Sequence, residues 1–156
     1  MICVSITEAT HQEALHAVER CAPAADAIEL RMDLIADGDL PQLMAAARCA
    51  SNRIKIIVTC RRKEESLIPE ANVPVTRKME MTQTAKMKLL KQAFVLRADF
   101  IDVELAAGER AISQLQSFRR KQKGLTRIIV SWHDTSKTPS LAKLKEIFLA
   151  CAKTGA

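Results

Sequence analysis

Charged side chains alternate with apolar ones in the stretch AIELRMDL, residues 27–34. Glu29, Arg31 and Asp33 stand at every second position of an otherwise apolar run. A period of two is typical of a β-strand, because successive side chains point to opposite faces of a sheet. One face of this strand therefore carries carboxylates and a guanidinium, which can hold an anion or move a proton. The simpler alternative is an edge strand with one solvated face.

Three later apolar runs repeat this alternation, and their polar residues again lie toward the carboxyl end. They are Thr59 and Arg61 in IKIIVTCR, Asp102 and Glu104 in FIDVEL, and Ser131 and His133 in RIIVSWH. A solvated face would accept Lys, Ser and Gln in any order, whereas these positions repeatedly hold acids, an arginine and a histidine. We therefore expect the polar faces to line an active site.

The runs that carry these residues belong to five predicted strand-helix units. Strands are expected at 2–6, 27–34, 54–61, 100–105 and 127–133, and helices at 8–20, from 39, 78–96, 110–123 and from 138. Asp39 is the expected N-cap of the second helix, and Gly124 the C′ residue of the fourth. Thr138 is expected to cap the fifth helix, with Pro139 in its first position.

Strands that alternate with helices predict an α/β protein with a parallel sheet and right-handed crossovers. A doubly wound sheet would show a glycine-rich loop after its first strand, but residues 7–9 (TEA) contain no glycine. Helices cover both faces of that sheet, whereas a (βα)8 TIM barrel keeps its inner face for other side chains and its chemistry at the carboxyl ends of the strands. We expect a barrel of this kind, with about the first five βα units present in a single domain, residues 1–156.

The composition fits one globular domain of 156 residues, 48% of them hydrophobic, with a net charge of +6. No segment resembles a membrane span or a signal peptide, and five cysteines without a C-x-x-C pair predict reduced, mostly buried thiols in a cytoplasmic protein. The basic runs lack the interleaved aromatic residues that stack on bases. The expected partner is thus a small anionic molecule, with no nucleic acid or membrane.

Taken together, the motifs resemble type I 3-dehydroquinate dehydratase, a lyase of the shikimate pathway of aromatic amino-acid biosynthesis. The matching segments are ICVSI, IELRMD, IIVTCR with Glu65 four residues after Arg61, DFIDVEL, IIVSWHD and KTPS, in this order. The resemblance implies a (βα)8 barrel that converts 3-dehydroquinate to 3-dehydroshikimate through a Schiff base. It implies no metal and no organic cofactor.

The resemblance also implies a role for each matching residue. His133 matches the general base and later acid, and Glu65 the carboxylate that orients it. Glu29, Arg31 and Arg61 match the groups that hold the hydroxyls and carboxylate of the substrate. Residues 66 and 67 (SL) stand where the family usually has two glycines, which puts the position of Glu65 against His133 in question. The other inner acids, Asp33, Asp102 and Glu104, are expected to fix neighbouring arginines.

The end of the sequence departs from the family pattern. KTGA matches the segment that leads into the sixth strand, which in the family carries the imine-forming lysine. Lys63 and Lys137 lie in loops near the expected mouth of the barrel, and we expect neither to replace it. The chain is therefore expected to be an N-terminal portion that is inactive alone. Since five strands cannot close an eight-stranded barrel, we expect a homodimer or another partner to cover the exposed strand edges.

Two further hypotheses remain open. The chain could be a non-catalytic half-barrel that self-associates or binds a partner through its open edges. It could also be a metal-dependent barrel enzyme, an aldolase or epimerase, with Glu29, Asp33, Glu104 and His133 as ligands. Arginines at positions 31 and 61 argue against the metal, because they would repel a cation.

Overall fold

In the computed structural model, which describes residues 1–66 and 81–156, five parallel strands alternate with five α-helices. The strands are β1 Cys3–Ile6, β2 Ala27–Arg31, β3 Lys55–Thr59, β4 Phe100–Glu104 and β5 Arg127–Ser131. The α-helices are α1 His11–Cys21, α2 Leu40–Ala50, α3 Gln83–Val95, α4 Glu109–Gln122 and α5 Leu141–Lys153. Two short 3-10 helices, η1 Lys63–Glu65 and η4 Leu105–Ala107, follow β3 and β4.

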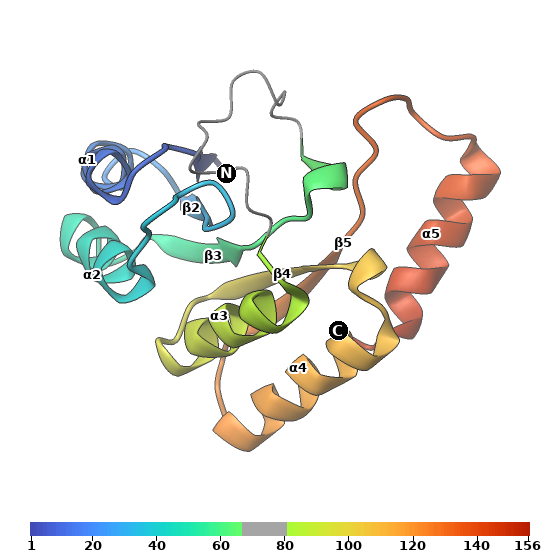
Figure 1. The fold of residues 1–156 in the computed structure, drawn as a ribbon. Helices are drawn as coiled ribbons and strands as arrows, with labels where there is room; N and C mark the ends of the chain where they lie inside the picture. Colours follow the sequence, from blue (N-terminus) through green and yellow to red (C-terminus); the bar gives the residue numbers. More distant parts are fainter. Residues whose placement is uncertain (67–80) are drawn as a thin grey trace.

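The strands lie in the order β1-β2-β3-β4-β5, and every neighbouring pair is parallel (Figure 1). A doubly wound sheet reverses its strand order at a switch point, and this order never reverses. Repeated right-handed crossovers place successive helices on the same side of the sheet, as in a barrel. The prediction of a partial (βα) barrel with five units is confirmed.

The register of the sheet separates an apolar outer face from a polar inner face. Ile28 lies opposite Ile56, and Leu30 opposite Val58, and all four are fully buried on the helical side. On the inner side Glu29 lies opposite Ser5. Burial of the outer side chains against the helices supplies the main core, which explains why the polar residues could be kept together on the inner face.

Local sequence signals account for these helix ends, with one correction. Asp39 accepts a hydrogen bond from the Gln42 amide at 2.9 Å, so the predicted cap of α2 is confirmed. The prediction for α5 is wrong by two residues, because Ser140 caps it through the Lys143 amide. At the end of α4 the C-cap is Lys123, which is left-handed with φ of 49°, so Gly124 is the C′ residue as predicted.

Other boundaries also differ from the predictions. The first helix begins at His11 and not at residue 8, and the third and fifth strands each end two residues earlier than expected, at Thr59 and Ser131. The second strand ends at Arg31, where a turn begins in which the Leu34 amide donates to the Arg31 carbonyl at 2.8 Å. The third helix begins after Thr82, which accepts from the Ala85 amide. Residues 78–80 of the predicted helix lie outside the described residues.

All five cysteines are free, but the prediction that most are buried is wrong. Cys60 alone is buried, and burial raises the pKa of its thiol to about 12. Cys3 is exposed because it lies on an edge strand, on the inner face that no helix covers. Within residues 1–66 and 81–156, no helix combines the length and the apolar character needed to cross a membrane.

Candidate active site

The inner face gathers the polar side chains at the carboxyl ends of neighbouring strands. Parallel register places Arg31 opposite Thr59, Thr59 opposite Asp102, and Glu104 opposite Ser131. Directly opposed side chains on one face of a sheet come within contact distance, so a single polar layer runs across the strands. This is the layer that the period of two predicted.

In this layer Glu29 of β2 contacts side chains from both neighbouring strands, β1 and β3. Its carboxylate accepts hydrogen bonds from Ser5 Oγ at 2.6 Å and Thr59 Oγ1 at 2.7 Å, and Arg61 lies at 3.7 Å. Burial would raise the pKa of Glu29, but the two hydroxyls and the charges of Arg61 and Arg31 outweigh it and lower the pKa. Glu29 is therefore a carboxylate at neutral pH.

Arg31 pairs with Asp33 two residues further along the chain. Its Nε and terminal nitrogen donate to the two Asp33 oxygens at 3.0 and 2.7 Å, a bidentate contact, and the terminal nitrogen also donates to Ser66 Oγ at 3.3 Å. Burial opposes the charge of Arg31, but Asp33 outweighs it and raises the pKa of the guanidinium. Asp33, and not Glu29, forms the ion pair with Arg31, because the turn after β2 brings Asp33 closer.

Arg61 is held from the other side by Asp102. The two charged groups are 3.4 Å apart, and Ser131 Oγ donates to the second Asp102 oxygen at 2.5 Å. Burial raises the pKa of Asp102, although Ser131 and Arg61 partly oppose the shift. Arg61 Nε is buried and finds no hydrogen-bond partner among the described residues.

His133 and Glu65 lie against each other at the mouth of the strands. Glu65 Oε2 accepts from the His133 backbone amide at 3.0 Å and lies 3.2 Å from the ring nitrogen Nδ1. Glu65 is buried in η1, whose last turn closes when the Ser66 amide donates to the Lys63 carbonyl. Ser66 has φ of −93°, so this turn requires no glycine at that position, and Leu67 lies outside the described residues.

A cavity of about 330 Å³ brings four of the five predicted site residues together. Arg31, Arg61, Glu65 and His133 line it, whereas Glu29 lies behind Arg61. Asp134 and Thr135 also line the cavity, and neither was predicted as a site residue. Their position directly after His133 was the available signal, since a loop that leaves a strand at this end returns over the mouth of the barrel.

The four candidate metal ligands do not form a cluster. Glu29 is held by hydroxyls, Asp33 by Arg31, and His133 by Glu65. Glu104 accepts from the Arg62 amide at 2.6 Å, and burial raises its pKa. In the part of the chain that the structure describes, no three His, Cys, Asp or Glu side chains could jointly hold a metal ion. The inner acids instead hold arginine side chains or backbone amides, as expected for Asp33 and Asp102.

The fold and this arrangement define a class. Parallel barrel strands carry a histidine-carboxylate pair and two arginines at their carboxyl ends, beside a cavity, as in (βα)-barrel enzymes. The family model for type I 3-dehydroquinase matches residues 2–156 of this sequence. The chain belongs to the type I 3-dehydroquinase family.

Individual relatives show how far the similarity extends. The chain is 29% identical over 147 residues to 3-dehydroquinate dehydratase of Methanocaldococcus jannaschii, a match that covers 94% of this chain and 59% of that protein. It is 30% identical over 155 residues to the enzyme of Desulfotalea psychrophila, covering 99% and 61%. The crystal structure of type I 3-dehydroquinate dehydratase from Clostridium difficile superposes with a TM-score of 0.81 at 22% identity, over 99% of this chain and 59% of that one. The chain thus spans about three fifths of the length of these relatives.

Proposed function

We propose that the chain supplies the substrate-binding and proton-transfer part of a 3-dehydroquinate dehydratase active site. His133 acts as general base and then acid, and Glu65 orients it. Arg31, Arg61 and Glu29 hold the carboxylate and hydroxyls of 3-dehydroquinate. The observation that carries the proposal is the Glu65–His133 pair in the same cavity as both arginines.

The reaction removes water from 3-dehydroquinate to give 3-dehydroshikimate. A base takes a proton from the carbon next to the ketone, a double bond forms, and a hydroxyl on the following carbon leaves as water after it receives a proton. The electron pair freed by the proton needs a sink, which in this family is an imine between the ketone and a lysine. A single histidine can carry the proton from the carbon to the leaving hydroxyl.

The contacts of His133 suit this task. A proton on Nδ1 satisfies the contact with Glu65 at 3.2 Å and leaves Nε2 with its lone pair as the base. The backbone amide of His133 donates to the same carboxylate oxygen, so the ring and the main chain are held by one group. Holding the base in a fixed orientation toward the substrate can supply a large part of the rate enhancement of an enzyme.

The arginines suit an anionic substrate for a related reason. Asp33 fixes Arg31 and Asp102 fixes Arg61, so both guanidinium groups are oriented before a ligand arrives. Arg61 Nε is the buried donor that no described residue accepts from. Both guanidinium groups line the cavity, so their charges are placed to attract a substrate carboxylate.

We propose that no lysine of this cavity forms the imine. Lys137 lines the cavity, but its side chain is exposed. A nucleophilic lysine is desolvated or placed beside another cation, whereas the Lys137 amine is exposed to water. We therefore expect this chain alone to bind 3-dehydroquinate without dehydrating it.

The test is borohydride reduction in the presence of 3-dehydroquinate, followed by intact mass measurement. The chain is compared with a version extended by the segment that follows the matched region in the Methanocaldococcus jannaschii relative. An adduct on the extended version alone supports the proposal. An adduct on the short chain that disappears in Lys137→Met would show that Lys137 forms the imine, against the proposal. No adduct on either version would count against the assigned activity.

A second candidate function is suggested by the surface at the β5 end of the sheet. Helix α5 contains no buried residue, and Leu141 and Phe148 are 68% and 70% exposed. Figure 1 shows α5 beside the open edge of β5, and β1 forms the opposite edge. Open edges and exposed apolar side chains favour association with another chain. A half-barrel that binds a partner would form a stable oligomer and give no borohydride adduct in either version.

A further inference from the structure

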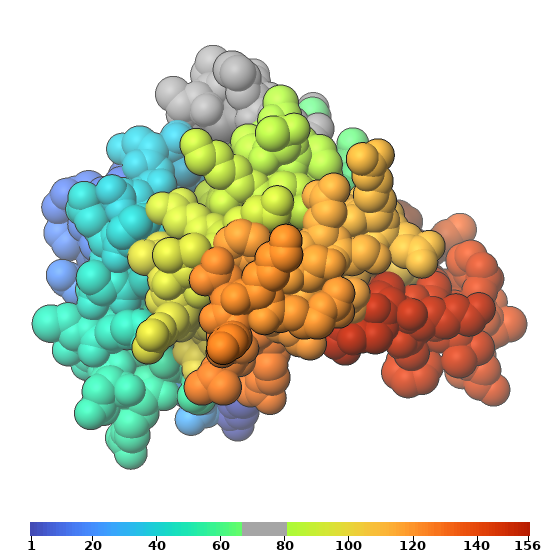
Figure 2. All heavy atoms as spheres, turned by 90° about the horizontal axis from the view of Figure 1, so that it is seen from below, coloured from blue at the N-terminus to red at the C-terminus, as the bar shows by residue number. Residues whose placement is uncertain are grey.

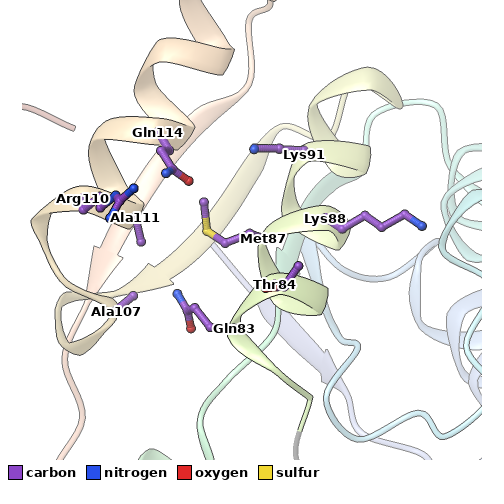
Figure 3. A pocket seen from close by; sticks show the side chains of 9 residues that line it. All are labelled: Gln83, Thr84, Met87, Lys88, Lys91, Ala107, Arg110, Ala111 and Gln114. Carbon is purple, nitrogen blue, oxygen red and sulfur yellow. The ribbon is translucent and has the colours of Figure 1, made fainter.

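Two adjoining hollows lie on the outer side of the molecule, between α3 and α4. Their volumes are about 540 and 430 Å³, and Lys91, Arg110 and Gln114 line both. Figure 2 shows α3 and α4 side by side on this face, and Figure 3 shows the space between them from close by. We call the two hollows together the α3–α4 groove. It shares no residue with the cavity that contains His133.

The walls of the α3–α4 groove are positively charged. Lys88 and Lys91 come from α3, which contains no acidic residue, and Arg110 and Lys121 come from α4, whose one acid is Glu109. Glu109 does not line either hollow. No carboxylate within residues 1–66 and 81–156 forms an ion pair with any of these four cations. Among the described residues, the charge of these four side chains is thus not neutralised, and it would attract an anion.

The groove also offers apolar and amide groups between the cations. Phe118 contacts Phe94 with ring centroids 5.8 Å apart, which joins α4 to α3, and Lys91 Nζ lies 5.9 Å from the Phe118 ring. Figure 3 shows Lys91 reaching across the space toward Gln114, while Lys88 points away from it. The Gln114 amide can donate and accept, as a peptide backbone requires of a partner.

The dimensions favour an extended occupant. From Arg110 to Lys121 the helix rises about 16 Å, a length that an extended peptide of about five residues spans. Two hollows in a row suit such a chain better than a compact ligand, which a single enclosed pocket would surround. Alternate side chains of an extended segment point the same way, so acidic residues could face the cations and apolar residues could face Met87 and Phe118.

We propose that the α3–α4 groove docks an extended acidic segment of a partner protein. Carboxylates of the segment pair with Lys91, Arg110 and Lys121, and its apolar residues cover Met87 and Phe118. The groove is separate from the cavity with His133, so docking leaves the proposed active site open. The charge complementarity between an acid-free groove and an acidic segment carries the choice of occupant.

Fluorescence anisotropy with a labelled peptide of alternating glutamate and leucine tests the proposal. The peptide is expected to bind the chain at low salt and to bind more weakly at physiological ionic strength. Lys91→Glu and Arg110→Glu should each weaken binding about tenfold. If a charge reversal disturbs folding, the milder variants Lys91→Met and Arg110→Met replace it. They should also bind the peptide more weakly than the unmodified chain does. Lys145→Glu, an exposed site on α5, is the matched control and should leave binding unchanged.

Five outcomes would overturn the proposal, and the first four concern the peptide. The acidic peptide could fail to bind the unmodified chain, or Lys145→Glu could weaken its binding as much as Lys91→Glu does. A peptide of alternating lysine and leucine could bind equally well. Inorganic phosphate, at the same concentration of negative charge, could displace the acidic peptide. This fourth outcome would make the groove a site for small anions. Tighter binding of a single-stranded oligonucleotide that Lys91→Glu abolishes would equally exclude a protein segment as the occupant.

Discussion

Glu29 and Asp102 share the inner face of the sheet, yet their pKa values shift in opposite directions. Burial raises both, but Glu29 accepts from two hydroxyls and faces two arginines, so its pKa falls below the ordinary value. Asp102 has one hydroxyl and Arg61, and burial prevails. The charged form of Glu29 is therefore favoured by folding, whereas the charged form of Asp102 is disfavoured.

This difference predicts opposite effects of two neutral substitutions on stability. Glu29→Gln should lower the free energy of unfolding at neutral pH, because the lowered pKa of Glu29 contributes stability above its ordinary value of 4.5. The loss should shrink as the pH falls through the lowered pKa. Asp102→Asn should be more stable than the unmodified chain at neutral pH. That gain should disappear below the ordinary value of 3.8, where the carboxyl is protonated in both states.

Urea unfolding at several pH values measures both differences. Each variant has nearly the same shape as the residue it replaces. The sign of the change in unfolding free energy, and its dependence on pH, therefore reflect the lost charge and not a change in packing. A destabilising Asp102→Asn at neutral pH would mean that the attraction to Arg61 outweighs the burial of the carboxylate.

Thr59 gives a second prediction at the scale of one residue. Its side chain is 1% exposed and its hydroxyl donates to Glu29 at 2.7 Å. Thr59→Val keeps the shape but removes one donor to a carboxylate, which should cost about 2 kcal/mol of unfolding free energy. Thr84→Val at an exposed position of α3 is the control and should change stability little. Equal effects of the two substitutions would contradict the importance of the Glu29 contact.

At the scale of elements, α4 ends in a conformation that its sequence does not favour. Lys123 has φ of 49°, a left-handed conformation in which a side chain is strained, although a glycine follows directly. The Lys123 amide donates to the Arg120 carbonyl, so the turn closes at this residue. The next residues must then enter β5 in register with β4, which determines where the helix ends.

Lys123→Gly should therefore raise the free energy of unfolding, because glycine adopts the left-handed conformation without strain. The net gain should be about 0.5 kcal/mol, since glycine also increases the conformational freedom of the unfolded chain. Gln122→Gly, one residue earlier and helical, should instead destabilise it by about 1 kcal/mol. Thermal unfolding of the two variants beside the unmodified chain gives both signs. A destabilising Lys123→Gly would show that the lysine side chain contributes more than its strained backbone costs.

At the scale of the whole molecule, one side is covered by helices and the β5 end is not. Helix α5 is tied to α4 by Gln116, whose side chain donates to the Thr154 carbonyl, while Leu144, Phe148 and Leu149 remain exposed. Exposed apolar side chains on one helix, beside an open strand edge, favour association between chains. This surface and the α3–α4 groove differ in kind, since one is apolar and the other cationic.

We expect the chain to self-associate through α5 in a concentration-dependent manner. Phe148→Glu should shift the equilibrium toward the monomer, because a carboxylate would have to be desolvated in the contact. Lys145→Glu, exposed on the same helix, should not do so. Sedimentation velocity over a range of concentrations measures the shift. A chain that stays monomeric throughout would exclude self-association through this face.

Periodicity and local signals were enough to determine much of this protein from sequence. The period of two at Glu29 and Arg31 placed polar residues on one face, the alternation of strands and helices predicted the partial barrel, and Asp39 marked the start of α2. These features depend on neighbours within a few residues along the chain. A single sequence therefore contains the information that decides them.

Only the tertiary structure decided how closely the polar groups meet and which further partners they have. Ser131 holds Asp102, Glu104 accepts from the Arg62 amide, and the expected Glu65–His133 pair forms at 3.2 Å across 68 positions of sequence. The α3–α4 groove likewise depends on how two helices pack over β3 and β4. Such pairings are set by strand register and helix packing, which juxtapose residues far apart in the chain, and no local pattern encodes the distance between their side chains.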